Sequence, residues 1–175
     1  TNFKIPINKN IEMNLKTIFS ENINYAGIAP GAGEKNKIWP IKNFIEICKY
    51  LELKCYILVF YIGPQEKEYE KVLKDSFKNA IFLENEKSLS NYSNIEIIMA
   101  STKFLKFAIS NDSGVSHMLS TNYCPLIKLF GPKDSKKFTP KLKNLITINS
   151  SEVNSNKIED ISVQRVKTAI EEKGL

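Results

Sequence analysis

The most constraining feature of the sequence is an uninterrupted apolar run at Cys55–Ile62, which ends at Gly63-Pro64. The run has the length of a strand and is rich in aromatic and β-branched residues. A strand without polar alternation is typical of a parallel sheet whose two faces are both covered by helices. We therefore expect an α/β fold, in which the rest of the chain supplies the covering helices.

The segments on either side of this run alternate between strand-like and helix-like patterns. The expected strands are Ile23–Ala29, Ala80–Leu83, Phe104–Ser110, Pro125–Phe130 and Leu145–Ile148. The expected helices are Ile11–Phe19, Pro40–Leu51, Gln65–Phe77, Asn94–Ser101, Gly114–Thr121 and Ile158–Lys173. This alternation predicts a mostly parallel open sheet with helices on both faces and right-handed crossovers. Phe3–Ile7 is interrupted by a proline, so we expect an edge strand or a linker there, and Gly131–Pro140 reads as a loop.

Some side chains are expected in the core from their spacing or their chemistry. In the helix expected at 65–77, Tyr69, Val72 and Leu73 should face inward. The cysteines lack the spacing of metal ligands, and buried free cysteine usually behaves as a small apolar residue of a reducing compartment. We therefore place all three in the core: Cys48, Cys55 and Cys124.

Length and charge narrow the classes of function. A chain of 175 residues is large enough for one domain with a real core. The formal net charge is +6, which raises the possibility of a nucleic-acid or anionic-membrane surface. The lysines are dispersed, however, and no basic run is interleaved with aromatic residues. We therefore expect no nucleic-acid binding, and only some attraction for phosphorylated ligands or an anionic membrane face.

A polar motif follows the strand expected at 104–110. Asn111-Asp112-Ser113-Gly114 would form the turn into the next helix, with Asp112 or Ser113 as its N-cap. Gly114 would let a ligand approach the backbone closely. In open α/β sheets, ligands bind outside the carboxyl ends of the strands, where backbone N–H groups can face an anion. The motif therefore predicts a site for a phosphate-bearing ligand.

A second loop, Pro30–Lys37, should lie at the same edge of the sheet and contains Gly31-Ala32-Gly33. Lys37 could neutralise a phosphate there, or it could be a solvated lysine. His117, the only histidine, lies one helical turn after Ser113 and could face the same ligand, or it could be a core or surface residue. A place near the helix N-terminus would favour its neutral form. The sequence shows neither a cluster with metal-ligand spacing nor a nucleophile elbow.

Several short motifs then occur in a fixed order between about Ile23 and Pro140. They are Pro30-Gly31-Ala32, Lys37-Ile38-Trp39-Pro40, Gly63-Pro64-x-Glu66, Asn111-Asp112-Ser113-Gly114-x-x-His117 and Pro125…Phe130-Gly131-Pro132. This order resembles the C-terminal half of glycosyltransferase family 9, the ADP-heptose:lipopolysaccharide heptosyltransferases. The resemblance favours the functional interpretation of Lys37, Asp112 and His117 over the structural one.

The resemblance implies a GT-B fold built from two Rossmann-like domains. This chain would supply a linker with a short helix at 1–20 and the Rossmann-like donor-binding domain at 21–175. The N-terminal domain of the same protein would bind the acceptor and supply the catalytic Asp, so no catalytic residue is expected in this chain.

The resemblance also assigns roles to site residues. Lys37 and the Ser113-Gly114 backbone would hold the donor diphosphate, Asp112 would contact the sugar, and His117 would support the pocket. Glu66 would be an acidic contact to the nucleotide. Family members often carry Ser or Thr just after the first glycine of the Gly-rich loop, whereas this chain has backbone N–H groups to offer at Gly31, Ala32 and Gly33.

The expected function is binding of a nucleotide-diphosphate-sugar donor, ADP-heptose or similar, for lipopolysaccharide or cell-envelope glycan synthesis without a metal or other cofactor. The acceptor would be a lipid-linked glycan, reached from the cytoplasm at the inner face of the inner membrane through peripheral contact. Two alternatives remain: a GT-B transferase or epimerase that uses UDP-sugars, and a non-catalytic nucleotide-binding α/β domain.

Overall fold

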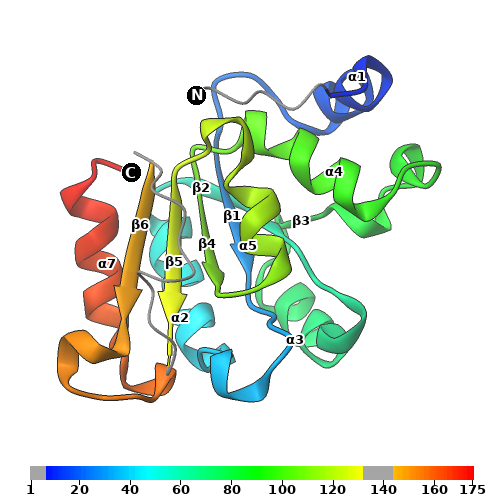
Figure 1. The fold of residues 1–175 in the computed structure, drawn as a ribbon. Coiled ribbons are helices and arrows are strands. Elements are labelled where there is room, and N and C mark those ends of the chain that lie inside the picture. Colours follow the sequence, from blue (N-terminus) through cyan, green and yellow to red (C-terminus); the bar gives the residue numbers. More distant parts are fainter. Residues whose placement is uncertain (1–6, 132–143) are drawn as a thin grey trace, which may run out of the picture.

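The computed structural model describes residues 7–131 and 144–175. In these residues, six parallel strands form one sheet in the order β3-β2-β1-β4-β5-β6 (Figure 1). The strands are β1 (Asn24–Ala29), β2 (Tyr56–Phe60), β3 (Ile81–Phe82), β4 (Phe107–Asn111), β5 (Leu126–Phe130) and β6 (Leu145–Asn149). This order is that of a Rossmann-type doubly wound sheet, which confirms the predicted fold class.

Helices cover both faces of the sheet. They are α1 (Lys9–Ile18), α2 (Ile41–Leu53), α3 (Lys67–Ser76), α4 (Asn94–Ser101), α5 (Gly114–Leu119) and α7 (Val163–Glu172). The core cluster on one face takes its helical residues from α2, α3 and α7, and the cluster on the other face takes them from α1, α4 and α5. A sheet buried on both faces explains why β2 is entirely apolar, why β5 is apolar except for Lys128, and why β4 becomes polar only in its last two residues.

The chain changes direction across the sheet between β1 and β4. From β1 it proceeds outward through β2 to β3, and from β4 it proceeds outward in the other direction through β5 to β6. In open α/β sheets, a crevice forms outside the carboxyl ends of the strands at such a topological switch point. The loops that follow β1 and β4 therefore flank the place where this fold binds ligands.

Two expectations about the core are wrong. Val72 is 48% exposed, whereas Leu73 is fully buried and packs in the same core cluster as Phe77, the residue that follows α3. Cys55 is exposed and has a positive φ of 63°, because it forms the tight turn between α2 and β2. Cys48 and Cys124 are buried as expected, and burial raises the pKa of both thiols, that of Cys124 to about 12.

Several element boundaries also differ from the expected ones. The strand expected at 80–83 keeps only Ile81–Phe82, and β4 begins at Phe107 because Thr102–Phe104 forms a 3-10 turn. The last helix begins at Val163, since the Ser162 side chain caps it by accepting the Arg165 N–H, and residues 158–160 form a separate 3-10 turn. Most of the segments expected at 3–7 and 131–140 lies outside the described residues.

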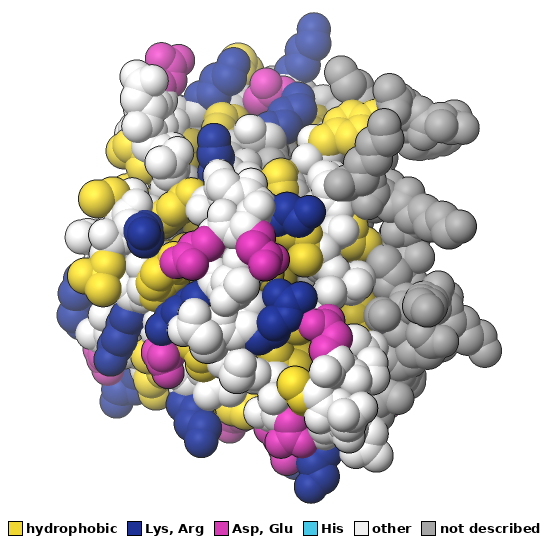
Figure 2. Space-filling view, turned by 90° about the vertical axis from the view of Figure 1, so that its left-hand side faces the viewer, with side chains coloured by type: hydrophobic (Ala, Val, Ile, Leu, Met, Phe, Trp, Pro, Cys, Tyr) yellow, Lys and Arg dark blue, Asp and Glu magenta, His cyan; other side chains and the backbone are white. Residues whose placement is uncertain are grey.

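The surface agrees with the dispersed lysines of the sequence. On the face that Figure 2 shows, at the α7 side, basic and acidic side chains are interspersed rather than separated. Among the helices that the structure describes, none has the length and apolar character needed to cross a membrane.

Candidate functional site

One buried side chain joins the two loops at the switch point. Asn111, at the end of β4, donates from Nδ2 to the Pro30 carbonyl at 2.7 Å, and its Oδ1 accepts the Trp39 backbone N–H at 3.2 Å. Pro30 and Trp39 stand at the two ends of the Gly-rich loop. Because Asn111 is fully buried, these hydrogen bonds are shielded from water and fix the loop against β4. Sequence reasoning included Asn111 in the motif but gave it no role.

The turn after Asn111 is fixed by its own serines. The Ser113 hydroxyl caps α5 by accepting the Ser116 N–H, and the Ser116 hydroxyl accepts the Ser113 N–H in return, each at 3.4 Å. Ser113 is thus the N-cap, and Asp112 is left to other contacts. A Cβ at Gly114 would meet no atom within 4 Å, and the same is true at Gly33, so both backbones face open space.

Glu66 lies directly under the Gly-rich loop. Its side chain is nearly buried, and a side chain at Gly31 or at Gly63 would collide with its carboxylate. A side chain at either position would therefore force the Glu66 carboxylate to move out of its present place. This packing places a carboxylate in the wall of the cleft between the β1 and β4 loops.

Two adjoining cavities lie in this cleft. One has a volume of about 350 Å³ and is lined by the Gly-rich loop, Glu66 and the start of α5. The other, of about 190 Å³, is mostly apolar and is lined by α4, α5 and the loop after β2. They share five lining residues: Tyr61, Gly63, Pro64, Val115 and Met118. Glu84 also lines the smaller cavity, where apolar surroundings raise the pKa of its carboxyl to about 7.

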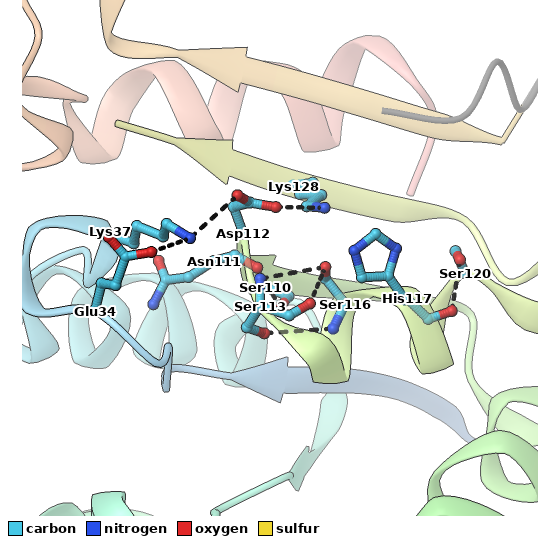
Figure 3. Close-up of polar contacts among 10 residues, drawn as sticks. All are labelled: Glu34, Lys37, Ser110, Asn111, Asp112, Ser113, Ser116, His117, Ser120 and Lys128. Atoms are coloured by element: carbon cyan, nitrogen blue, oxygen red, sulfur yellow. Dashed lines mark hydrogen bonds and ion pairs between the residues drawn. The ribbon is translucent and has the colours of Figure 1, made fainter. Parts of the chain in front are cut away.

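A charged cluster lies beside the cleft, centred on Asp112 (Figure 3). Asp112 Oδ1 is 2.7 Å from the Lys128 ammonium, and its Oδ2 is 3.9 Å from the Lys37 ammonium, which also pairs with Glu34 at 2.8 Å. Lys37 is 16% exposed and Asp112 is 12% exposed, whereas Lys128 is only 2% exposed. The carboxylate thus joins a cation from the middle of β5 and a cation from the loop after β1.

The match to known families decides what kind of chain this is. The model of glycosyltransferase family 9 (heptosyltransferase) matches residues 4–168, nearly the whole sequence. The chain belongs to glycosyltransferase family 9.

Solved structures agree with the family 9 fold. The glycosyltransferase family 9 protein of Veillonella parvula covers 98% of this chain with a TM-score of 0.81 and 18% identity. E. coli heptosyltransferase WaaC with ADP-2-deoxy-2-fluoro heptose covers 93% of this chain, with a TM-score of 0.71 and 24% identity. E. coli ADP-heptose lps heptosyltransferase II covers 98% of this chain, with a TM-score of 0.71 and 21% identity. The chain spans about half of each: 53%, 47% and 54%. No curated protein matches the sequence.

The structure divides the site residues predicted for this family 9 chain into two groups. The lining of the larger cavity includes Gly31, Ala32, Gly33, Glu66, Ser113 and Gly114. Lys37 and Asp112 lie next to it, in the charged cluster, and His117 stands beside that cluster on α5. Among the described residues, no group of three His, Cys, Asp or Glu side chains could hold a metal ion.

His117 is exposed at the surface of α5, and the cause of its altered acidity differs from the expected one. It stands in the last turn of the six-residue helix α5, so the helix N-terminus does not explain its state. Burial lowers the pKa of the imidazole, the charge of Lys128 lowers it further, and Asp112 acts in the opposite direction. In Figure 3 the ring lies on the side of α5 that faces Lys128.

Sequence reasoning missed Lys128. The one available signal was its place as the only polar residue of Leu126-Ile-Lys-Leu-Phe130, a strand otherwise fully apolar. A buried ammonium in a central strand needs an anionic partner, and Asp112 of the neighbouring strand end supplies it.

Proposed function

We propose that this chain is the donor-binding half of a heptosyltransferase-like glycosyltransferase and that its donor is a nucleotide-diphosphate-sugar, namely ADP-heptose. The observation that carries the proposal is the pair of adjoining cavities at the switch point, one bordered by open glycine backbone and the other apolar. Their volumes together fall in the range of about 300–1,000 Å³ that is typical of small-molecule sites.

The two cavities suit different parts of such a donor. The diphosphate would lie in the larger cavity, where Gly33 and Gly114 leave backbone open to it. The apolar cavity would take the base, and the Glu66 carboxylate in the wall of the larger cavity would accept hydrogen bonds from ribose hydroxyls. The sugar would then lie toward Asp112, whose carboxylate can accept its hydroxyl groups.

This arrangement would assist departure of the nucleoside diphosphate. Cleavage of the bond to the sugar develops negative charge on the bridging oxygen, and preorganised N–H groups and cations lower the cost of that charge. Lys37 is the cation of the charged cluster that can change partner, because Glu34 is half exposed and such an ion pair contributes little free energy. We propose that Lys37 exchanges Glu34 for the diphosphate when the donor binds.

We propose that the acceptor site and the catalytic carboxylate lie outside this chain. A lipid-linked glycan of the lipopolysaccharide or cell-envelope pathway would be the acceptor, bound with the catalytic Asp by an N-terminal domain of the same protein. The 175-residue chain should accordingly bind donor without transferring sugar.

Calorimetric titration with ADP, UDP and GDP tests the proposal. ADP should bind most tightly, and Lys37→Ala should weaken it about 10- to 100-fold, since one hydrogen bond to a charged group contributes about 1.5–3 kcal/mol. Lys49→Ala is the control of equal charge change, because Lys49 is exposed in the second half of α2 and lines neither cavity. Preference for UDP would favour a UDP-sugar enzyme instead, and failure of all three nucleotides at millimolar concentration would overturn the proposal.

A further inference from the structure

Lys128 is the most unusual residue of the core. It occupies the middle of β5, is 2% exposed, and points to the same face as Leu126, two residues earlier, which packs in the core cluster of that face. Its ammonium lies 2.7 Å from Asp112 and 4.9 Å from the centre of the Phe130 ring. Desolvation of such a pair consumes most of its electrostatic gain, and apolar replacements are often as stable. Stability alone therefore gives little reason for a lysine here.

The proposed donor site does give a reason, because it contains a carboxylate. Asp112 stands beside the place proposed for a diphosphate, so the negative charges of its carboxylate and of the diphosphate repel each other. Lys37 cannot neutralise both anions at once. With Lys128 present, the group Lys37, Asp112 and Lys128 carries a net charge of +1 beside the single negative charge of Glu34, and without Lys128 the net charge of the group would be zero.

We propose that Lys128 is a positioning residue of the donor site: it neutralises and holds Asp112 from inside the sheet, so that Lys37 is available to the diphosphate. The proposal rests on the proposed function of the cleft. It assigns the two lysines separate tasks, since Lys128 stays in the buried ion pair while the more exposed Lys37 changes partner.

His117 reports on this ion pair without any ligand. It is the only histidine of the sequence, so its ring signals in an NMR titration are unambiguous. Among the described residues, the charged groups that act on its imidazole are Lys128 from β5 and Asp112 from the end of β4. Lys128→Met should therefore raise the pKa of His117, and Asp112→Asn should lower it.

ADP lacks the sugar that would be transferred and would contact Asp112. Its affinity therefore measures the net charge of Lys37, Asp112 and Lys128. Lys128→Met should weaken ADP on the order of tenfold, the effect of one charge over roughly 10 Å in a protein. Asp112→Asn should strengthen it, and the double variant should return to the wild-type affinity because its net charge is again +1. Lys128→Arg should retain binding. Lys106→Met is the control of equal charge change, since Lys106 is exposed at the opposite end of β4.

A return of the double variant to wild-type ADP affinity distinguishes this electrostatic role from a merely structural one. If Lys128 were only structural, the losses of affinity in the two single variants would add. If Lys128→Met does not fold, Asp112→Asn and the double variant provide the same comparison for both ADP affinity and the His117 titration. If the wild-type protein binds ADP and Lys128→Met binds it equally well, the proposed role of Lys128 is overturned while the proposed function of the cleft stands. Wild-type protein that binds no ADP would overturn the proposed function, and an unchanged His117 pKa in Lys128→Met would independently reject the electrostatic coupling.

Discussion

At the scale of single residues, the site depends on side chains whose partners are distant in the sequence. Asn111 contacts residues that precede it by 72 and 81 positions, and it satisfies a buried N–H group and a buried carbonyl of the same loop. Asp112 is positioned in the same way by a lysine of the next strand. Such contacts place the Gly-rich loop and the α5 turn at one cleft, so a change at Asn111 should affect both folding and binding.

Asn111→Ala should lower the free energy of unfolding by about 2–4 kcal/mol, because each buried backbone group left without a partner costs about 1–3 kcal/mol. Urea unfolding followed by circular dichroism measures the loss. Asn85→Ala is the matched control, since Asn85 is exposed and its side chain donates to the partly exposed carboxylate of Glu70, so a change within about 0.5 kcal/mol is expected. Equal stability of the two variants would show that the Asn111 hydrogen bonds do not hold the loop.

At the scale of elements, local sequence patterns determine which segments become strands and helices, and tertiary contacts determine where they end. The apolar run at β2 predicted a buried parallel strand because no polar residue alternates along its length. The start of α7 depends on the Ser162 cap, and the exposure of Val72 depends on which side of α3 the sheet covers. The Asn111 hydrogen bonds and the Lys128–Asp112 ion pair could not be predicted, because they require the register of β4 against β1 and β5.

Neighbouring residues of α3 provide a test at this scale. Leu73→Ala should destabilise the protein by about 2–5 kcal/mol, the usual cost of removing a fully buried leucine side chain. Val72→Ala should change stability by no more than about 0.5 kcal/mol, because Val72 is largely exposed. Urea unfolding of the two variants measures both changes in stability. A large loss in Val72→Ala would mean that α3 packs through the face first expected from the sequence.

At the scale of the whole molecule, the chain is a doubly wound domain whose candidate site lies at the point where strand order reverses. Membership of glycosyltransferase family 9 and the similar solved structures agree with this architecture. The central claim is that the cleft binds a nucleoside diphosphate in the folded state. Binding to the folded state alone must stabilise the whole domain, whatever the details of the contacts.

The most direct test is therefore unfolding of the 175-residue chain with and without ADP. ADP at 100 times its dissociation constant should raise the free energy of unfolding by ~2.7 kcal/mol, and the gain should grow with the logarithm of the ADP concentration. Lys37→Ala should show a much smaller gain at the same concentration, whereas Lys49→Ala should match the wild type. An unfolding free energy that millimolar ADP leaves unchanged in the wild-type protein would contradict the account.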